Sequence, residues 1–139
     1  MREIKFRGKT INGGEWIYGD LIKTNGATGD GWAIQYYDPE DGWMIKDVRE
    51  QTIGQYTGLS DQNCKEIYEG DIVEVTSLHY KTFMEKMKAV IVYDDDLCCY
   101  DFETTDRKRC MCRTIPDCHI EVIGNIYDNP ELIKRGENL

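Results

Sequence analysis

A cluster of cysteines in the C-terminal half holds most of the side chains that could do chemistry. Five of the six cysteines lie between Cys98 and Cys118, and His119 follows directly. Thiolates and imidazoles are the ligands of structural zinc, which binds four of them, usually from C-x2-4-C pairs. This chain has CC, CxC and CH spacings instead. The candidate zinc ligands are Cys99, Cys110, Cys112, Cys118 and His119.

The alternative for these cysteines is that they are small, buried, apolar side chains, and we favour it. The sequence Leu97–Ile115 predicts a hairpin around Thr104–Lys108. If the hairpin is symmetric about Thr105 and Asp106, Cys99 lies opposite Cys112. A metal site there would take two cross-strand thiols, yet burial alone explains the same residues. We therefore expect no cofactor.

Catalysis is not expected from either chemical group in this region. Cys118 and His119 are adjacent, so on a strand they point to opposite faces and form no dyad. The acidic run Asp94–Asp96, with Asp101, could hold Mg²⁺ for a metal-dependent nuclease. Aspartates also favour turns, because their carboxylates bind nearby backbone N–H groups, and this is the interpretation we favour. The prediction is a protein that is not an enzyme.

Basic residues gather on the same predicted hairpin and could bind nucleic acid. The candidates are Arg107, Lys108, Arg109 and Arg113. A second group, Lys5, Arg7 and Lys9, shares one face of a predicted strand near Trp16. Cations beside aromatic rings suit a nucleic-acid strand. However, the net charge of −9 opposes general nucleic-acid binding, and an exposed hairpin tip explains the basic run equally well.

Composition places the chain among globular, β-rich proteins. Glycines are frequent and prolines rare among its 139 residues, and aromatic residues make up 11% of the chain. Short aromatic and β-branched runs separated by glycine predict many short strands. No apolar run reaches the ~20 residues that span a bilayer, and the charged start is not a signal peptide. We expect no membrane association, a cytoplasmic location and reduced thiols.

Turn signals divide the chain into a predicted N-terminal β-hairpin module over residues 1–50 and a second domain over residues 51–139. Asn12-Gly13-Gly14 and Asp38–Gly42 predict hairpin turns in the first part. Residues 77–88 fit a short amphipathic helix or a long loop equally. Asn129, Pro130 and Glu131 predict the start of a short C-terminal helix.

Three stretches together resemble the YopX family of phage and prophage proteins. They are REIKFRGK with EWIYGDLI, TIGQYTGLSDQNCKEIYEGDIVEV, and IEVIGNIYDNPEL. The resemblance implies a mainly β fold with an SH3-like small barrel in the second domain, and the five or six predicted strands there agree. Where the family usually has Asn-Gly, this chain has Asn63-Cys64. Positive φ is costly for cysteine, so we predict a different turn type here.

These observations together predict a phage- or prophage-encoded accessory protein in the host cytoplasm. We expect it to be non-catalytic and to act by binding a host or phage protein and by self-association as a homo-oligomer. The alternative is a nucleic-acid-binding accessory protein that uses the basic hairpin.

Overall fold

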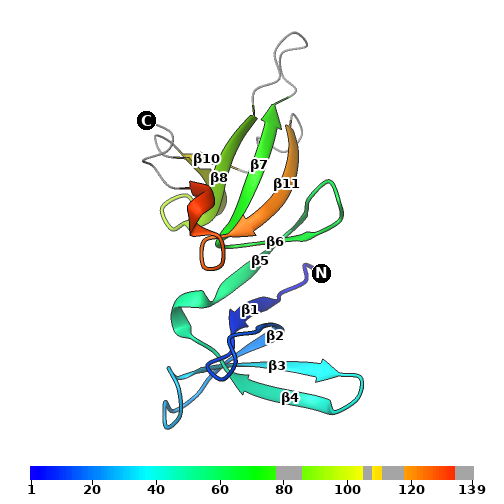
Figure 1. Cartoon of the computed structure of the whole chain (residues 1–139), viewed down its shortest axis with the longest axis vertical. Coiled ribbons are helices and arrows are strands. Elements are labelled where there is room, and N and C mark those ends of the chain that lie inside the picture. Colours follow the sequence, from blue (N-terminus) through cyan, green and yellow to red (C-terminus); the bar gives the residue numbers. More distant parts are fainter. Residues whose placement is uncertain (78–85, 105–107, 111–117, 134–139) are drawn as a thin grey trace. The chain divides into compact units, whose positions relative to one another are not determined.

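The computed structural model describes residues 1–77, 86–104, 108–110 and 118–133, and these are mainly β-strand (Figure 1). The chain forms two compact units, Met1–Gly58 and Leu59–Leu139. Most of the segment predicted as helix or loop, residues 78–85, lies outside the described residues. Within the described residues, no helix has the length and apolar character needed to cross a membrane.

The first unit is an antiparallel sheet built largely from neighbouring hairpins. Its strands are β1 (Phe6–Lys9), β2 (Trp16–Lys23), β3 (Trp32–Asp38), β4 (Gly42–Asp47) and β5 (Gly54–Ser60), with a 3₁₀ turn, η1 (Glu50–Thr52), before β5. The sheet order is β4-β3-β2-β1-β5-β6. β5 runs past the division at Gly58, and β6 (Glu66–Tyr68) belongs to the second unit. The strand β4 therefore forms an edge of this sheet.

Both predicted hairpin turns of the first unit are confirmed. Gly13 and Gly14 adopt positive φ values of 102° and 67°, which a side chain would disfavour. In the second turn, Asp38 Oδ1 accepts hydrogen bonds from the backbone N–H groups of Glu40 at 2.8 Å and Asp41 at 3.2 Å. Local turn chemistry thus places β1 against β2 and β3 against β4.

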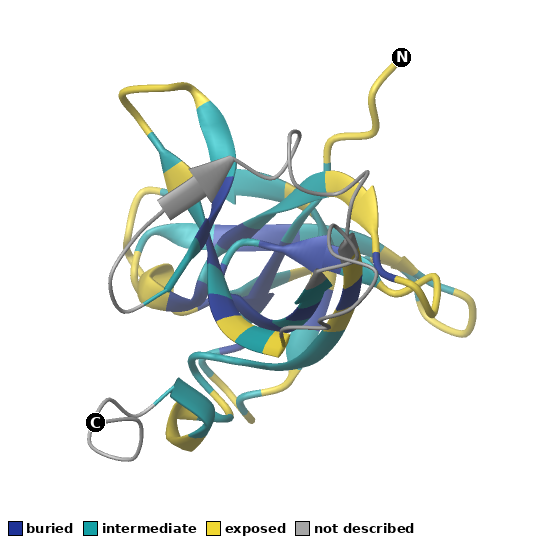
Figure 2. Cartoon of the chain, turned by 90° about the horizontal axis from the view of Figure 1, so that it is seen from above, coloured by how far each residue is buried: buried dark blue, intermediate teal, exposed yellow. Residues whose placement is uncertain are grey.

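The core of the first unit lies on one face of its sheet. Ile17, Ile34 and Val48 are buried together. The partly buried residues around them are Phe6, Leu21, Trp32, Tyr36 and Ile53. Because side chains alternate along a strand, the residues between these on β2 and β3 face the opposite side. Figure 2 shows the buried residues along the strands and the exposed ones mainly at turns.

The second unit contains an open five-stranded antiparallel sheet. Its strands are β7 (Asp71–Ser77), β8 (Lys86–Asp94), β9 (Cys99–Glu103), β10 (Lys108–Cys110) and β11 (Cys118–Asn125), in the order β10-β9-β8-β7-β11. β10 and β11 are the two edges, and in the described part of the chain no strand pairing joins them. The mainly β class is confirmed, whereas the described strands form no closed barrel.

The predicted register of the β9–β10 hairpin is confirmed where it is described. Lys108 lies opposite Glu103, and Cys110 lies opposite Asp101. This register is symmetric about Thr105 and Asp106, as the sequence predicted. Cys112, the predicted partner of Cys99, lies outside the described residues.

The core of the second unit forms where β7, β8, β9 and β11 meet. Its buried residues are Ile67, Val73, Val75, Ala89, Ile91, Phe102 and Ile120. β7 pairs with β8 on one side and with β11 on the other, with a bulge between Val122 and Gly124. The inner strand β7 is therefore paired on one side by a segment more than 40 residues later in the sequence.

Asp61 organises the turn that precedes β6. Its carboxylate accepts backbone hydrogen bonds from Asn63 at 2.8 Å, Lys65 at 2.9 Å and Val122 at 2.9 Å. Burial raises the pKa of Asp61, but the three backbone donors outweigh this effect, and the pKa lies below its ordinary value of 3.8. The fold therefore stabilises the ionised form of the Asp61 side chain.

The prediction of a different turn type at Cys64 is wrong. Cys64 adopts φ of 63°, the left-handed conformation that glycine accepts without strain. Asp61 fixes the backbone on both sides of Cys64 through Asn63 and Lys65, and the Cys64 N–H donates to the Asp61 carbonyl at 3.0 Å. These bonds hold the turn in spite of the local strain.

At the position of the predicted C-terminal helix, the described residues form a single 3₁₀ turn, η3 (Pro130–Ile133). The side chain of Asn129 accepts a hydrogen bond from the backbone N–H of Asn125 at 3.3 Å, so it ties the turn to the end of β11. Residues 134–139 lie outside the described part.

Candidate functional site

The face of the first sheet opposite its core carries exposed aromatic side chains. Across β3 and β4, Tyr37 lies opposite Trp43 and Gln35 lies opposite Ile45. Across β2 and β3, Asp20 lies opposite Gln35. Directly opposite residues share a face, so Asp20, Gln35 and Ile45 form one row and Tyr37 and Trp43 the next. We call this surface the aromatic face.

Apolar side chains of this size are seldom left in solvent without a reason. Trp43 is 66% exposed, and Tyr37 and Ile45 are each 61% exposed. The Tyr37 and Trp43 rings meet edge to face, with centroids 5.5 Å apart. A contiguous exposed apolar patch at the edge of a sheet is typical of an interaction surface.

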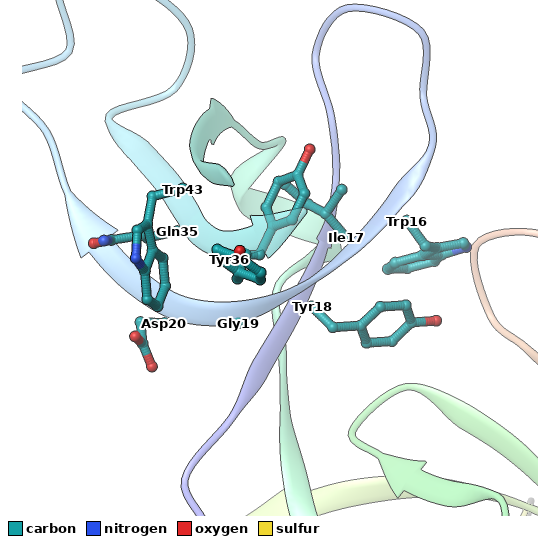
Figure 3. A pocket seen from close by; sticks show the side chains of 9 residues that line it. Trp16, Ile17, Tyr18, Gly19, Asp20, Gln35, Tyr36 and Trp43 are labelled. Atoms are coloured by element: carbon teal, nitrogen blue, oxygen red, sulfur yellow. The ribbon is translucent and has the colours of Figure 1, made fainter. Parts of the chain in front are cut away.

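An open pocket of about 390 Å³ lies in the aromatic face. Figure 3 shows Trp16 and Tyr18 at one end and Trp43, Gln35 and Asp20 at the other. Gly19 lies in the pocket wall, and its main chain passes so close to β3 that a Cβ would clash with the Gln35 carbonyl oxygen. The pocket therefore combines aromatic surface with one carboxylate and one amide.

Cations of β1 cover the Trp16 end of this face. The Arg7 guanidinium carbon lies 4.7 Å from the centroid of the Trp16 ring, and Lys9 Nζ lies 5.5 Å from it. Arg7 is only 5% exposed. Arg7 therefore contributes to the structure of the sheet and does not offer its charge to a nucleic-acid strand.

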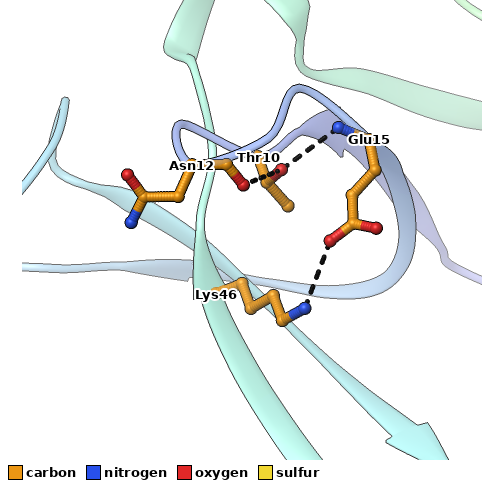
Figure 4. Close-up of polar contacts among 4 residues, drawn as sticks. All are labelled: Thr10, Asn12, Glu15 and Lys46. Atoms are coloured by element: carbon orange, nitrogen blue, oxygen red, sulfur yellow. Dashed lines mark hydrogen bonds and ion pairs between the residues drawn. The ribbon is translucent and has the colours of Figure 1, made fainter.

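A polar network at the β1–β2 turn fixes the position of the edge strand β4 (Figure 4). The Thr10 hydroxyl donates to the Asn12 carbonyl at 2.9 Å and accepts from the Glu15 N–H at 3.2 Å. The Glu15 carboxylate in turn binds Lys46 Nζ at 3.2 Å. Hydrogen bonds that the Lys46 ammonium donates to Tyr36 and Glu15 raise the pKa of Lys46. Lys46, the cation of this network, therefore lies away from the aromatic face, because the side chains of Lys46 and Trp43 point to opposite faces of β4.

The structure places the candidate zinc ligands on different strands. Cys99 is half-buried on β9, with Sγ 3.4 Å from Asp101 Oδ1. Cys110 is on the neighbouring strand β10, opposite Asp101. Cys118 and His119 are on β11, which β7 and β8 separate from β9.

Along the sheet, the step from β9 to β11 is three strand spacings, about 14 Å. The described strands therefore bring Cys99 and Cys110 near one another but not His119, whose side chain is exposed. Among the residues that the structure describes, no group of three or more His, Cys, Asp or Glu side chains could hold a metal ion.

The basic and acidic candidates lie on the same sheet. Lys108 and Arg109 are on β10, whereas Arg107 and Arg113 lie outside the described residues. The Asp94 carboxylate accepts backbone hydrogen bonds from Asp96 at 2.9 Å and from Leu97 at 3.2 Å. This is the turn role that the sequence predicted for the acidic run.

Sequence reasoning did not identify which residues on the aromatic strands of the first unit are exposed. Alternation correctly put Trp16 and Tyr18 on one face and Ile17 on the other, but it could not say which face is buried. The signal that could have found the site is the edge strand, where Trp43 and Ile45 alternate with Met44 and Lys46 directly after a turn. When both faces of an alternating edge strand carry apolar side chains, one apolar face is left outside the core.

Fold and site together define a two-unit, mainly β protein with an exposed aromatic face on its first sheet. The chain belongs to the YopX family, since the family model described as YopX protein matches residues 5–134. The chain is also similar to the crystal structure of protein EF1440 from Enterococcus faecalis, with a TM-score of 0.57 and 25% sequence identity. That match covers 96% of this chain and 100% of the other. No curated protein matches the sequence.

Proposed function

We propose that this chain is a non-catalytic, protein-binding accessory protein of phage or prophage origin that acts in the host cytoplasm. It binds a host or phage protein, and further copies of itself, through the aromatic face. The observation that carries the proposal is the exposure of Trp43, Tyr37 and Ile45 on two paired strands at a sheet edge. Aromatic residues are enriched at the centres of protein interfaces, where they contribute much of the binding energy.

Self-association is tested by sedimentation velocity on the full chain over a concentration series. We expect species heavier than one chain for the wild type, and a monomer for Trp43→Lys, because a buried lysine would oppose association. Tyr93→Lys is the matched control, since Tyr93 is 42% exposed in the second unit and should leave association unchanged. A wild type that stays monomeric at all concentrations refutes self-association.

Binding of another protein is tested by affinity purification from the phage-bearing host with the same variants. We expect a partner that is retained by the wild type and by Tyr93→Lys but lost with Trp43→Lys. A partner retained equally by all three chains would contradict the proposed surface. If nucleic acid, removed by salt, is retained instead, the alternative function on the basic hairpin is favoured.

We further propose that the second unit is a variant of the SH3-like fold. Its support is a set of five short antiparallel strands with a bulge in β11, the device that bends sheets toward closure. Amide-to-amide cross-strand NOEs between β10 and β11 in the full chain would support closure. A full set of assigned amides without such NOEs would refute it.

A further inference from the structure

We propose that the pocket in the aromatic face binds an arginine side chain of the partner protein, between the Trp43 ring and the Asp20 carboxylate. This inference rests on the protein-binding function proposed above and names the chemistry that the surface recognises. The pocket lies entirely in the first unit, and both residues line it (Figure 3).

Several other aromatic rings of the first unit are paired with cations. A lysine or arginine lies within 6.0 Å of the ring centroids of Trp16, Trp32, Tyr36 and Tyr56. Ring faces attract cations, and tryptophan does so best. In the described part of the chain no cation lies over Trp43 or Tyr37, although both are more than half exposed. The rings of Trp43 and Tyr37 are thus available to a cation from outside the chain.

The charges in and around the pocket favour a cationic ligand. Asp20 is exposed in the same pocket, one row along the sheet from the Tyr37–Trp43 pair. The pocket lining contains no lysine or arginine. Among the nearby cations, Lys46 is bound to Glu15 on the other side of β4. Arg7 and Lys9 lie over the Trp16 ring, at the end of the pocket away from Trp43 and Asp20 (Figure 3). The chain as a whole has a net charge of −9, so the long-range field also attracts a cationic partner.

Arginine fits this pocket better than lysine does. Its planar guanidinium stacks on a ring and binds a carboxylate with two parallel hydrogen bonds, whereas lysine is a strongly hydrated point charge. The pocket offers one aromatic wall, one carboxylate and the Gln35 amide as a further acceptor. An open pocket of about 390 Å³ also suits one long side chain better than a buried ligand.

The test is an NMR titration of the isotope-labelled full chain at low salt, read at the Trp43 indole N–H, which Trp43→Phe assigns. The probe is acetyl-Gly-Arg-Gly-amide, and the comparison peptide carries citrulline, which has the same shape without the charge. We expect the arginine peptide to shift the Trp43 signal with millimolar affinity and the citrulline peptide to leave it unchanged. Asp20→Asn should weaken binding about fivefold, and Asp95→Asn, in the other unit, should not change it.

The inference is overturned if the arginine peptide does not shift the Trp43 signal, or if citrulline shifts it equally. It is also overturned if Asp20→Asn has no effect. These results leave the proposed function standing as long as Trp43→Lys abolishes association or partner binding. Conversely, if Trp43→Lys changes neither while the arginine peptide binds, the cation pocket stands and the proposed function falls.

Discussion

The carboxylate of Asp61 accepts a hydrogen bond from the backbone N–H of Val122 at 2.9 Å, across 61 residues of sequence. The same carboxylate closes its own turn through Asn63 and Lys65. One buried side chain, 8% exposed, thus joins a local turn to the last strand of the second unit. Loss of the Asp61 carboxylate should therefore weaken both the turn and the contact with the last strand.

We expect Asp61→Asn to destabilise the protein by about 1 to 3 kcal/mol. The amide can accept at one oxygen, but its NH₂ group then faces a backbone donor that it cannot bind. Chemical denaturation monitored by circular dichroism measures the free energy of unfolding. Asp95→Asn, in an exposed turn, is the matched control and should change it by less than about 0.5 kcal/mol. Equal effects of the two variants would contradict the role of Asp61.

Asp61 should also make stability depend on acid pH. Its pKa is lower in the folded protein than its ordinary value of 3.8, so the folded state favours the ionised form. The stability that this contributes is complete above the unfolded pKa and is lost as the pH falls through the folded pKa. Unfolding curves between neutral pH and the acid limit should show wild type and Asp61→Asn converging below 3.8. Parallel pH profiles would show that Asp61 is not the group responsible.

Cys64→Gly should stabilise the protein by about 0.5 to 1 kcal/mol. Glycine removes the strain of φ at 63°, which exceeds the entropy that glycine adds to the unfolded chain. Cys64→Ala removes the thiol but keeps the Cβ, so it should bring no gain. The midpoint of thermal unfolding under reducing conditions distinguishes the two. A gain in both variants would point to the thiol and not to the backbone.

Gly19→Ala should destabilise the first unit by about 1 to 3 kcal/mol. The new Cβ would clash with the Gln35 carbonyl oxygen, and a backbone atom cannot move aside as a flexible side chain can. Hydrogen exchange of β2 and β3 amides reports the loss locally. Lys23→Ala, an exposed change on the same strand, should leave this protection intact. If hydrogen exchange is unchanged in Gly19→Ala, β3 moves to accommodate the new Cβ at no cost in stability, and the prediction is wrong.

Thr10→Val should destabilise the β1–β2 hairpin by about 1 to 2 kcal/mol. Valine has the shape of threonine but leaves the Asn12 carbonyl and the Glu15 N–H without the hydroxyl that links them. Thr28→Val removes a hydroxyl of similar geometry from an exposed site, where it donates to Asp47, and should have a smaller effect. Chemical denaturation of both variants compares their free energies of unfolding. A larger loss for Thr28→Val than for Thr10→Val would contradict the prediction.

The sequence was sufficient where the determinants are local. Asn12-Gly13-Gly14 and Asp38–Gly42 carry their own turn chemistry, and both hairpins form as expected. The symmetry of the β9–β10 hairpin about Thr105 and Asp106 followed from the strands on either side. In each case, pairing involves residues close in sequence, so the pattern and the contact report on the same few residues.

The sequence was insufficient where the determinants lie far apart. Nothing near Asp61 indicates that Val122 will donate to it, and the error at Cys64 arose because the supporting bonds were invisible. The exposed residues of the aromatic face could not be identified for a related reason. Alternation separates the faces of β4, but only the position of Ile34 and Val48 in the core decides that Trp43 faces solvent.

The late position of β11 has a consequence during protein synthesis. β7 carries the buried residues Ile72, Val73 and Val75, and one of its two edges pairs only with Cys118–Asn125. Until that segment leaves the ribosome, β7 presents an apolar strand with an unpaired edge, the form most prone to join another chain. A nascent or prematurely terminated chain that stops before Cys118 should therefore aggregate or require a chaperone, although every residue of β7 and β8 is present.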